Sequence, residues 1–334
     1  MRLLLLGMAA LAAAALPPHP RGYVCYRAEP APRIDGRLDD PAWRNATWTD
    51  WFVDIEGEAR PRPRFRTRAR MLWDERYFYI AAEMEEPHVW ATLTAHDSVI
   101  FHDNDFEVFI DPDGDSHRYF EFEINALNTG WDLFLPKPYK DGGKADNSWE
   151  IPGLRTAVHV DGTLNDPRDR DRGWSVEIAV PWAAFEGRPA PRDGEQWRVN
   201  FSRVEWRHEV EAGKYRKVAG TKEDNWVWSP QGRINMHLPE MWGDVHFSAR
   251  SRGPVAFRPD PSWATRMRLR EYYERQQAFR KQNRRWARPA ELAAPGLEVR
   301  PGADGWTACA AAETAGSLLC LRQDALFAIE PKPR

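Results

Sequence analysis

The sequence predicts a mainly β protein: an antiparallel β-sandwich (jelly-roll/immunoglobulin-like) followed by a C-terminal amphipathic helix and a small β appendage. Two observations predict the sandwich, namely many short runs of alternating apolar and polar residues, and turns rich in Gly, Asp and Pro between them. A shift to a basic composition without Gly or Pro after residue 261 predicts the helix. We therefore place the sandwich domain at 21–250 and the helix with a β-hairpin appendage at 251–334.

The N-terminus predicts export. Residues 3–16 are almost wholly apolar, Arg2 precedes them, and four alanines occupy 12–15. Such a run is too short to span a bilayer comfortably and is typical of a signal-peptide core. We expect a signal peptide at 1–20, a secreted or periplasmic protein, and no transmembrane segment in the mature chain.

Alternating runs of residues form the body of the predicted sandwich. These runs are 66–73, 77–84, 105–111, 119–125, 173–180 and 196–205. Short helical turns are expected at 39–43 and 181–185, because proline lies near the start of each. The order of strand, turn and strand indicates antiparallel neighbours.

The hairpin of 105–111 and 119–125 presents two different faces, because side chains alternate along a strand. The predicted core face carries Phe106, Val108, Ile110, Phe120, Phe122 and Ile124. The opposite face carries Glu107, Phe109, Asp111, Glu121, Glu123 and Asn125, with Trp131 shortly downstream. Opposed like charges are destabilising, so this face needs a cation, arginine partners or a ligand with many hydroxyl groups, unless it is an ordinary solvated face.

Acidic acceptors beside flat rings suit a sugar. A carboxylate accepts hydroxyl hydrogen bonds in charge-assisted form, and an aromatic ring packs on the apolar face of the sugar. The chain also contains 17 tryptophans, a residue type that serves both sugar stacking and large sandwich cores. The hairpin therefore predicts an exposed saccharide-binding face.

The turn of this hairpin has aspartate at alternate positions: Asp111, Asp113 and Asp115. This spacing is similar to that of a calcium loop, but the twelfth position holds Phe122 where an EF-hand has glutamate. Two interpretations stay open, a structural calcium site on these three residues and a simple Asp/Gly turn. We expect no other cofactor.

Three cysteines are present. Cys309 and Cys320 flank a polar stretch that contains Gly316, and in an exported protein this arrangement predicts a disulfide. Cys25 is then a lone thiol, a residue type that is more often buried and inert than reactive.

The C-terminal third begins with a predicted helix over 262–288. Ser262 is the expected N-cap and Pro289 the expected stop. Apolar residues at near-helical spacing are Leu269, Tyr272, Phe279 and Trp286. The basic helix could recruit a protein partner or touch an anionic surface, or it could be docked with a solvated outer face.

Composition excludes several classes of protein. The formal net charge of −3 gives no basic domain for nucleic acid, and a mean hydropathy of −0.67 excludes a polytopic membrane protein. No P-loop, dinucleotide fingerprint or metal-ligand helix is visible in the sequence.

An ordered set of motifs is similar to the family 9 carbohydrate-binding module and its relatives, within the DOMON-like β-sandwich superfamily. The motifs lie at 34–43, 72–79, 105–111, 173–182 and 242–245. The resemblance covers residues 25–247 and implies a β-sandwich with bound calcium ions, no catalysis of its own, and an association with polysaccharide catabolism.

The resemblance carries over part of a binding site. Xylan-binding members clamp a sugar between two tryptophans, aided by a glutamate, an arginine and an asparagine. The glutamate matches Glu107 and the asparagine matches Asn125, whereas Glu123 stands at the arginine position. One tryptophan position falls at Phe101 and the other near residues 236–237, which include His237.

Three functions follow in order of preference. The first is a secreted, non-catalytic carbohydrate-binding protein whose site residues are Phe101, Glu107, Phe109, Glu121, Glu123, Asn125, Trp131 and His237. The second is a glycoside hydrolase acting on O-glycosyl bonds through paired carboxylates, although the hairpin face reads as open and short of a cleft. The third is a haem-binding electron-transfer domain, for which the available ligands are Met71, Met84, His102 and His237.

Overall fold

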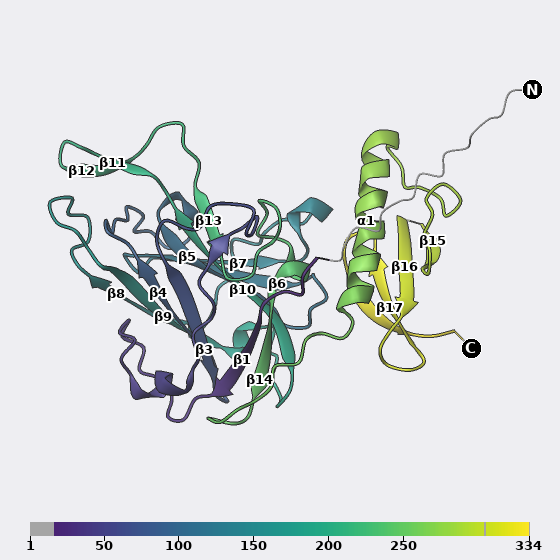
Figure 1. Cartoon of the computed structure of the whole chain (residues 1–334), viewed down its shortest axis with the longest axis horizontal. Helices are drawn as coiled ribbons and strands as arrows, with labels where there is room; N and C mark the ends of the chain where they lie inside the picture. The colour runs from purple at the N-terminus through teal and green to yellow at the C-terminus, as the bar shows by residue number, and fades with distance from the viewer. Residues whose placement is uncertain (1–16, 304, 334) are drawn as a thin grey trace, which may run out of the picture.

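The structure is a computed structural model that describes residues 17–303 and 305–333 (Figure 1). The apolar run at 3–16, and with it most of the predicted signal peptide, lies outside the described residues. The last residues of that predicted segment contact the body of the protein. Trp263 donates from Nε1 to the Pro17 carbonyl, and His19 Nε2 lies 3.3 Å from a carboxylate oxygen of Asp244.

Most strands belong to one curled sheet with the order β7-β6-β5-β10-β14-β1-β3-β4-β9-β8, and β13 and β2 extend it from β10. The strands are β1 (Gly22–Arg27), β2 (Val53–Asp54), β3 (Thr67–Trp73), β4 (Tyr77–Glu85), β5 (Asp105–Asp111), β6 (Tyr119–Asn125), β7 (Gly130–Leu135), β8 (Arg155–Asp161), β9 (Gly173–Pro181), β10 (Gln196–Glu205), β13 (Asp224–Val227) and β14 (Gly243–Ser248). A separate ribbon pairs β11 (His208–Glu211) with β12 (Lys214–Lys217). Short 3-10 helices are η1 (Pro41–Asn45), η2 (Ile100–His102), η3 (Tyr139–Asp141), η4 (Trp182–Ala184) and η5 (Pro239–Met241).

The curled sheet folds over itself into a sandwich, and its two halves share one hydrophobic core (Figure 1). Phe106 and Phe122, from β5 and β6, lie in the same buried cluster as Ile80 of β4 and Ile178 of β9. The predicted core face of the hairpin is therefore confirmed, and the bounds of β5, β6 and β10 coincide with the predicted runs.

One part of the fold departs from the antiparallel prediction. β1 pairs in parallel with both β14 and β3, with Gly22 opposite Asp244 and Tyr26 opposite Leu72. The partners are distant in sequence, so no hairpin turn forces an antiparallel arrangement. Cys25 lies on this strand, fully buried and unpaired, and burial raises the pKa of its thiol well above the ordinary value.

Two of the sequence motifs meet through Glu177 on β9. Its carboxylate accepts hydrogen bonds from the backbone N–H groups of Asp35 and Gly36, both at 2.8 Å, and from Trp43 Nε1 at 2.7 Å. Gly36 has a φ of 81°, and a Cβ there would lie 2.5 Å from the Val158 carbonyl carbon. These motif residues therefore stabilise the scaffold, and glycine is required at the turn.

The C-terminal unit is larger than the predicted hairpin. It contains α1 (Trp263–Asn283) and a four-stranded sheet of β15 (Glu298–Gly302), β16 (Gly305–Ala311), β17 (Ser317–Arg322) and β18 (Phe327–Pro331). Leu269 and Tyr272 of α1 pack on Trp306 and Leu319 of this sheet, so the apolar side of the helix is covered within the chain. The predicted disulfide is confirmed, since Cys309 and Cys320 are bonded.

The ends of the helix differ from the prediction. Ser262 occupies the N-cap position, but its hydroxyl donates to Asp260 and makes no capping bond. The helix ends at Asn283, because Arg284 adopts a left-handed conformation with a φ of 57°, before Pro289 is reached.

The C-terminal unit contacts the sandwich beside the β5–β6 turn. The Phe327 backbone N–H donates to the Asp115 carbonyl at 2.9 Å, and His117 Nε2 lies 2.7 Å from the Asp324 carbonyl. In Figure 1 this unit lies at one side of the sandwich, with α1 between the sandwich and β16 and β17. Within residues 17–303 and 305–333, no helix has both the length and the apolar composition needed to cross a membrane.

Candidate functional site

The register of four neighbouring strands brings acidic and aromatic side chains into one row across the sheet. Ser202 of β10 lies opposite Glu107 of β5, Glu107 opposite Glu123 of β6, and Glu123 opposite Trp131 of β7. Because each strand contributes one residue at the same level, these side chains share a face. In the adjacent row, Phe109 lies opposite Glu121.

This face is the floor of a pocket of about 290 Å³. We call it the acidic pocket, and its lining is Ile55, Phe101, Glu107, Phe109, Glu121, Glu123, Trp131, Leu133, Tyr139, Val204, Glu223, Asn225, Ile234, Asn235, Met236 and His237. The walls come from η2, β7, β13 and the segment before η5, so the pocket joins parts of the chain more than 130 residues apart.

The expectation of an open exterior face was wrong. Glu107 and Glu121 are each 4% exposed and Glu123 is 2% exposed. Segments distant in sequence cover the face, because Phe109 packs in a second hydrophobic cluster with Met236 and Trp242. Neither strand carries a local signal for this cover, since Met236 and Trp242 lie more than 100 positions away.

The carboxylates of the floor are unusually poor in partners. Asp105 Oδ2, Glu107 Oε2 and Glu121 Oε2 are buried without a hydrogen-bond partner. The Val204 N–H donates to Asp105 Oδ1 at 3.1 Å, and the Phe101 N–H donates to Glu123 Oε2 at 2.9 Å. Among the described residues that line the pocket there is no Arg and no Lys.

Burial and mutual repulsion raise the pKa values of these carboxyl groups. Burial, with a further contribution from the charge of Glu223, raises the pKa of Glu107 to about 7. Burial and then the Glu107 charge raise the pKa values of Glu121, Glu123 and Asp105 well above their ordinary range. The pocket thus disfavours the charged form of each of these carboxyl groups.

Aromatic rings form the walls. Phe101 and Trp131 lie with ring centroids 6.4 Å apart and planes 32° from parallel. At the rim, Tyr139 is 45% exposed and Ile234 is 70% exposed, which is uncommon for such large apolar side chains. Burial lowers the pKa of His237 to about 4, so its imidazole is neutral at pH 7, and Nδ1 lies 3.0 Å from the Tyr119 hydroxyl.

Seven of the eight predicted carbohydrate-binding residues line this pocket. They are Phe101 in η2, Glu107 and Phe109 in β5, Glu121 and Glu123 in β6, Trp131 in β7, and His237 before η5. The eighth, Asn125, does not. Its Oδ1 accepts the N–H groups of Leu127 and Thr129, and its Nδ2 donates to Leu93 and Asp103. Asn125 therefore shapes the turn after β6.

Sequence reasoning missed several lining residues. Tyr139 begins the short helix η3 and Ile234 lies in a loop. Glu223 immediately precedes β13 and Asn225 is its second residue, and no periodic pattern assigns either of them to a face. Asp105 does not line the pocket, but it lies on the same face and could have been found, because it alternates with Glu107 along β5.

The Asp111 loop has its own partners. Both oxygens of Asp111 accept loop N–H groups, from Gly114 at 3.0 Å and Ser116 at 2.9 Å, and Asp113 pairs with Arg188. Ligand atoms of Asp111, Asp113 and Asp115 lie within 4.8 Å of one another. A guanidinium and backbone donors thus already occupy part of the donor set that calcium would need, and calcium at this loop stays a prediction.

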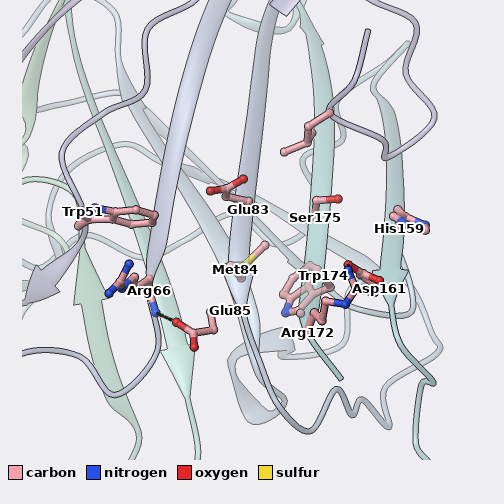
Figure 2. Close-up of a pocket in the computed structure, with 12 residues that line it drawn as sticks. Trp51, Arg66, Glu83, Met84, Glu85, His159, Asp161, Arg172, Trp174 and Ser175 are labelled. Atoms are coloured by element: carbon pink, nitrogen blue, oxygen red, sulfur yellow. Dashed lines mark hydrogen bonds and ion pairs between the residues drawn. The ribbon is translucent and has the colours of Figure 1, made fainter. Parts of the chain in front are cut away.

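A second hollow, of about 370 Å³, lies on the other half of the sheet (Figure 2). Exposed Trp51 lies at one side, and the Arg66 N–H donates to a Glu85 carboxylate oxygen at 3.3 Å. Arg172 lies 3.6 Å from a carboxylate oxygen of Asp161. Here acidic groups face arginines, in contrast to the acidic pocket.

The four residues considered as haem ligands lie in different environments. Met71 and Met84 are buried in the sandwich core, His102 is exposed, and His237 lies in the acidic pocket. Of the tryptophans, Trp226 and Trp228 are also in the core, which leaves Trp131 and Trp51 as those that line a hollow with an accessible edge.

Known proteins resemble part of this chain. Exoglucanase XynX of Acetivibrio thermocellus is 23% identical over 157 residues, which is 46% of this chain and 12% of that enzyme. Endo-1,4-beta-xylanase C of Paenibacillus barcinonensis is 30% identical over 102 residues, 30% of this chain and 8% of that enzyme. The chain thus spans only about a tenth of the length of these curated relatives.

Two solved structures are similar to this chain at low identity. A Bacteroides uniformis protein named for carbohydrate binding has a TM-score of 0.52 and 16% identity, and the match covers 69% of this chain and 100% of that one. The family 9 module of Caldicellulosiruptor kristjanssonii, solved with cellotriose, has a TM-score of 0.45 and 17% identity over 71% of this chain and 100% of that one.

The model of one protein family, described as carbohydrate family 9 binding domain-like, matches residues 34–227. The match includes β2 to β13, and with them β5, β6 and β7, which form the floor of the acidic pocket. It covers more than half of the chain, and the chain therefore belongs to the carbohydrate family 9 binding domain-like family.

Proposed function

We propose that the protein is a non-catalytic carbohydrate-binding protein and that its saccharide binds in the acidic pocket. The observation that carries the proposal is the combination of buried carboxylate oxygens without partners and aromatic walls in one hollow. The family of the chain supports the same class of ligand.

The chemistry of the pocket matches the two kinds of surface on a sugar. Saccharide hydroxyls donate to the free oxygens of Glu107 and Glu121, which are charge-assisted acceptors whenever they are ionised. Trp131 and Phe101 offer flat apolar surface for the C–H face of the ring. Exposed Tyr139 and Ile234 extend that surface to the rim, where a longer chain would leave the pocket.

The relatives suggest which saccharides to test. Their names describe an exoglucanase and xylanases, enzymes of β-linked plant polysaccharides, and the segment they share with this chain is a small part of each. We therefore propose gluco- and xylo-oligosaccharides as the ligand class, and a role in polysaccharide catabolism.

Isothermal titration calorimetry of the purified protein with cello- and xylo-oligosaccharides tests the proposal. Trp131→Ala is expected to weaken binding at least tenfold, because it removes the larger ring of the wall while leaving the carboxylates in place. Trp51→Ala is the matched control, since Trp51 is an accessible tryptophan of the second hollow, and its affinity is expected to equal that of wild type. Absence of binding to either series, or an equal loss in both variants, would contradict the proposal.

A glycoside hydrolase is a second candidate function, favoured by one observation. Burial raises the pKa of Glu107 to about 7, as a general acid requires, and Glu123 lies directly opposite. Release of reducing ends from cellulose or xylan by the wild type, and not by Glu107→Gln, would establish catalysis. We expect no release by either protein.

We also propose that the protein is exported. The apolar run at 3–16 supports a signal peptide, and the Cys309–Cys320 disulfide suits an oxidising compartment.

A further inference from the structure

We infer that His96, Asp97, Asp132 and Glu150 form a zinc site at the edge of the sandwich. These residues come from the loop before η2, from β7 and from the segment between β7 and β8, and β7 is an edge strand of the curled sheet. None of the four lines the acidic pocket, and Asp132 follows Trp131 along β7, so its side chain points to the other face of the sheet. The inference goes beyond the proposed function, because zinc binding can be measured without any sugar.

The three carboxylates converge on His96 Nε2. This nitrogen lies 3.1 Å from Glu150 Oε2, 3.4 Å from Asp97 Oδ1 and 3.5 Å from Asp132 Oδ1. Zinc binds nitrogen and oxygen at about 2.0–2.2 Å, so two ligand atoms of its tetrahedron lie about 3.3–3.6 Å apart. The distances from Nε2 are close to that spacing, and the ligand atoms of His96, Asp97 and Asp132 all lie within 4.8 Å of one another.

The second nitrogen of the ring fixes the tautomer. His96 Nδ1 lies 3.0 Å from the Gly130 carbonyl oxygen, which can only accept a hydrogen bond, so Nδ1 carries a hydrogen. The lone pair of the neutral imidazole is therefore on Nε2, the nitrogen that faces the carboxylates. Metal-binding histidines typically have this arrangement, in which the other ring nitrogen donates to a carbonyl or a carboxylate.

A second, independent observation is a buried oxygen of Asp132 without a hydrogen-bond partner. Asp132 is 1% exposed, and its Oδ2 accepts the Ile151 N–H at 2.6 Å, but Oδ1, the oxygen nearer His96, has no such bond. A proton on His96 Nε2 would leave this oxygen unsatisfied, because the hydrogen bond of that nitrogen is to Glu150. A metal ion would bind Nε2 and all three carboxylates at once.

The charges of the site also lack any other counterpart. Among residues 17–303 and 305–333, no arginine or lysine forms an ion pair with Asp97, Asp132 or Glu150. The side chains of His96 and Glu150 are 52% and 58% exposed, so an ion can enter from solvent while Asp132 closes the inner side.

The donor set favours zinc over other ions. Calcium and magnesium take oxygen ligands, whereas an imidazole nitrogen suits zinc, copper, nickel and iron. Copper(II) and nickel(II) favour a square-planar or tetragonal arrangement. In a square plane one of the three oxygens would lie opposite Nε2, about 4 Å away, but all three lie at 3.1–3.5 Å.

Isothermal titration calorimetry of ZnCl₂ into the full-length protein, stripped with EDTA and then freed of it, tests the inference. Wild type is expected to bind one zinc ion, and His96→Gln and Asp132→Asn to weaken that binding at least tenfold, because each removes a ligand. The amide oxygen in Asp132→Asn can still accept the Ile151 N–H, which preserves that contact of the fold. Far-UV circular dichroism confirms that each variant is folded.

His102→Gln is the matched control. His102 is an exposed histidine of η2, six residues after His96, and it forms no ion pair within the described part of the chain. This variant should bind zinc as wild type does.

Two further measurements report on the site itself. Cobalt(II) replaces zinc and absorbs visible light strongly in a tetrahedral site but weakly in an octahedral one, so wild type should show the strong bands and His96→Gln should lose them. Zinc should also raise the melting temperature of wild type, because an ion bound only by the folded protein stabilises it, and His96→Gln should abolish that increase.

Three outcomes would overturn the inference. The first is no zinc binding by wild type. The second is zinc binding that His96→Gln retains and His208→Gln abolishes, which would place the ion beside His88 and His208, whose ring centroids are 5.0 Å apart. The third is calcium binding that Asp132→Asn weakens tenfold in a protein that takes up no zinc. Sugar binding by a protein that takes up no zinc would leave the proposed function standing alone.

Discussion

Two groups of buried carboxylates lie on opposite faces of β10, and they differ in whether the chain supplies their partners. Along this strand Ser202 and Val204 point to the acidic pocket, whereas Arg203 and Glu205 alternate with them and point to the other face. We call the group that contains Arg203, Glu205 and Glu86 the arginine cluster.

In the arginine cluster, every charge has an internal counterpart. Arg203 Nη2 lies 2.8 Å from a carboxylate oxygen of Glu86 and 2.8 Å from one of Glu205, and Arg64 approaches Glu205 to 3.9 Å. Arg203 also donates to the Glu85 carbonyl at 2.8 Å, which links β10 to the end of β4. The cluster therefore stabilises the joint between the two halves of the sandwich.

The acidic pocket has the same kind of residue and similar burial but no guanidinium. Burial of a carboxylate therefore does not by itself distinguish a residue that stabilises the fold from a residue that binds a ligand. The presence or absence of a partner is more informative, because an unpaired buried carboxyl group either takes up a proton or is offset by something outside the chain.

The largest effect is expected from Arg203→Met. Removal of the guanidinium leaves Glu86 and Glu205 buried without their main counterion, and breaking a buried ion pair in this way costs about 3–5 kcal/mol of stability. Urea unfolding at pH 7 measures the change. Arg188→Met is the control, because its pair with Asp113 is partly exposed and is expected to contribute less than about 1 kcal/mol. Equal effects of the two variants would contradict the comparison.

Glu240 provides a second paired carboxylate, at the contact between the sandwich and α1. Burial would raise its pKa, but Arg270 at 3.2 Å and Lys140 at 2.8 Å outweigh burial and lower the pKa to about 2. A depressed pKa stabilises the fold above the unfolded value of about 4.5, and that stability is lost as the pH falls from about 4.5 toward 2. We expect Glu240→Gln to lose about 3 kcal/mol at pH 6 and little at pH 2.5.

Unfolding free energies of wild type and Glu240→Gln between pH 2.5 and pH 6 test this prediction. The two curves should converge in acid, because protonation of Glu240 in the wild type removes the same interaction that the substitution removes. Parallel curves would mean that Arg270 and Lys140 do not hold the carboxylate in its charged form.

A smaller effect of opposite sign is expected in the acidic pocket. Glu121→Gln in EDTA should raise stability by about 1–2 kcal/mol, because it removes a buried carboxylate whose Oε2 has no hydrogen-bond partner and that repels Glu107. Urea unfolding beside Glu240→Gln compares the same substitution in the two settings. A loss of stability in both would show that Glu121 has a structural partner.

Much of the sandwich was predictable from local patterns. The bounds of β5, β6 and β10, and the core positions of Phe106 and Phe122, follow from alternation within single strands. Parallel pairing of β1 was not predictable, because its partners β14 and β3 are distant in sequence and leave no turn between them.

The residues of the site also fall into those that local patterns predicted and those that they did not. Alternation placed Glu107, Glu121 and Glu123 on one face, but it also placed Asn125 there without revealing that its amide serves the turn after β6. The C-terminal unit likewise has two strands more than the expected hairpin. These strands, β15 and β18, have five residues each and are mostly exposed or half-buried, so their sequences carry little apolar signal.

The sequence by itself determined which residues share a face, because that depends only on the two-residue period of a strand. It also predicted the disulfide, because Cys309 and Cys320 flank a polar stretch with Gly316 that can form a turn, and the structure confirms the bond. Only the tertiary structure decided that the acidic face is a covered pocket and that no arginine reaches it. The physical reason is that cover and charge partners come from segments far along the chain, such as the residues around Met236, whose positions depend on packing of the whole sandwich.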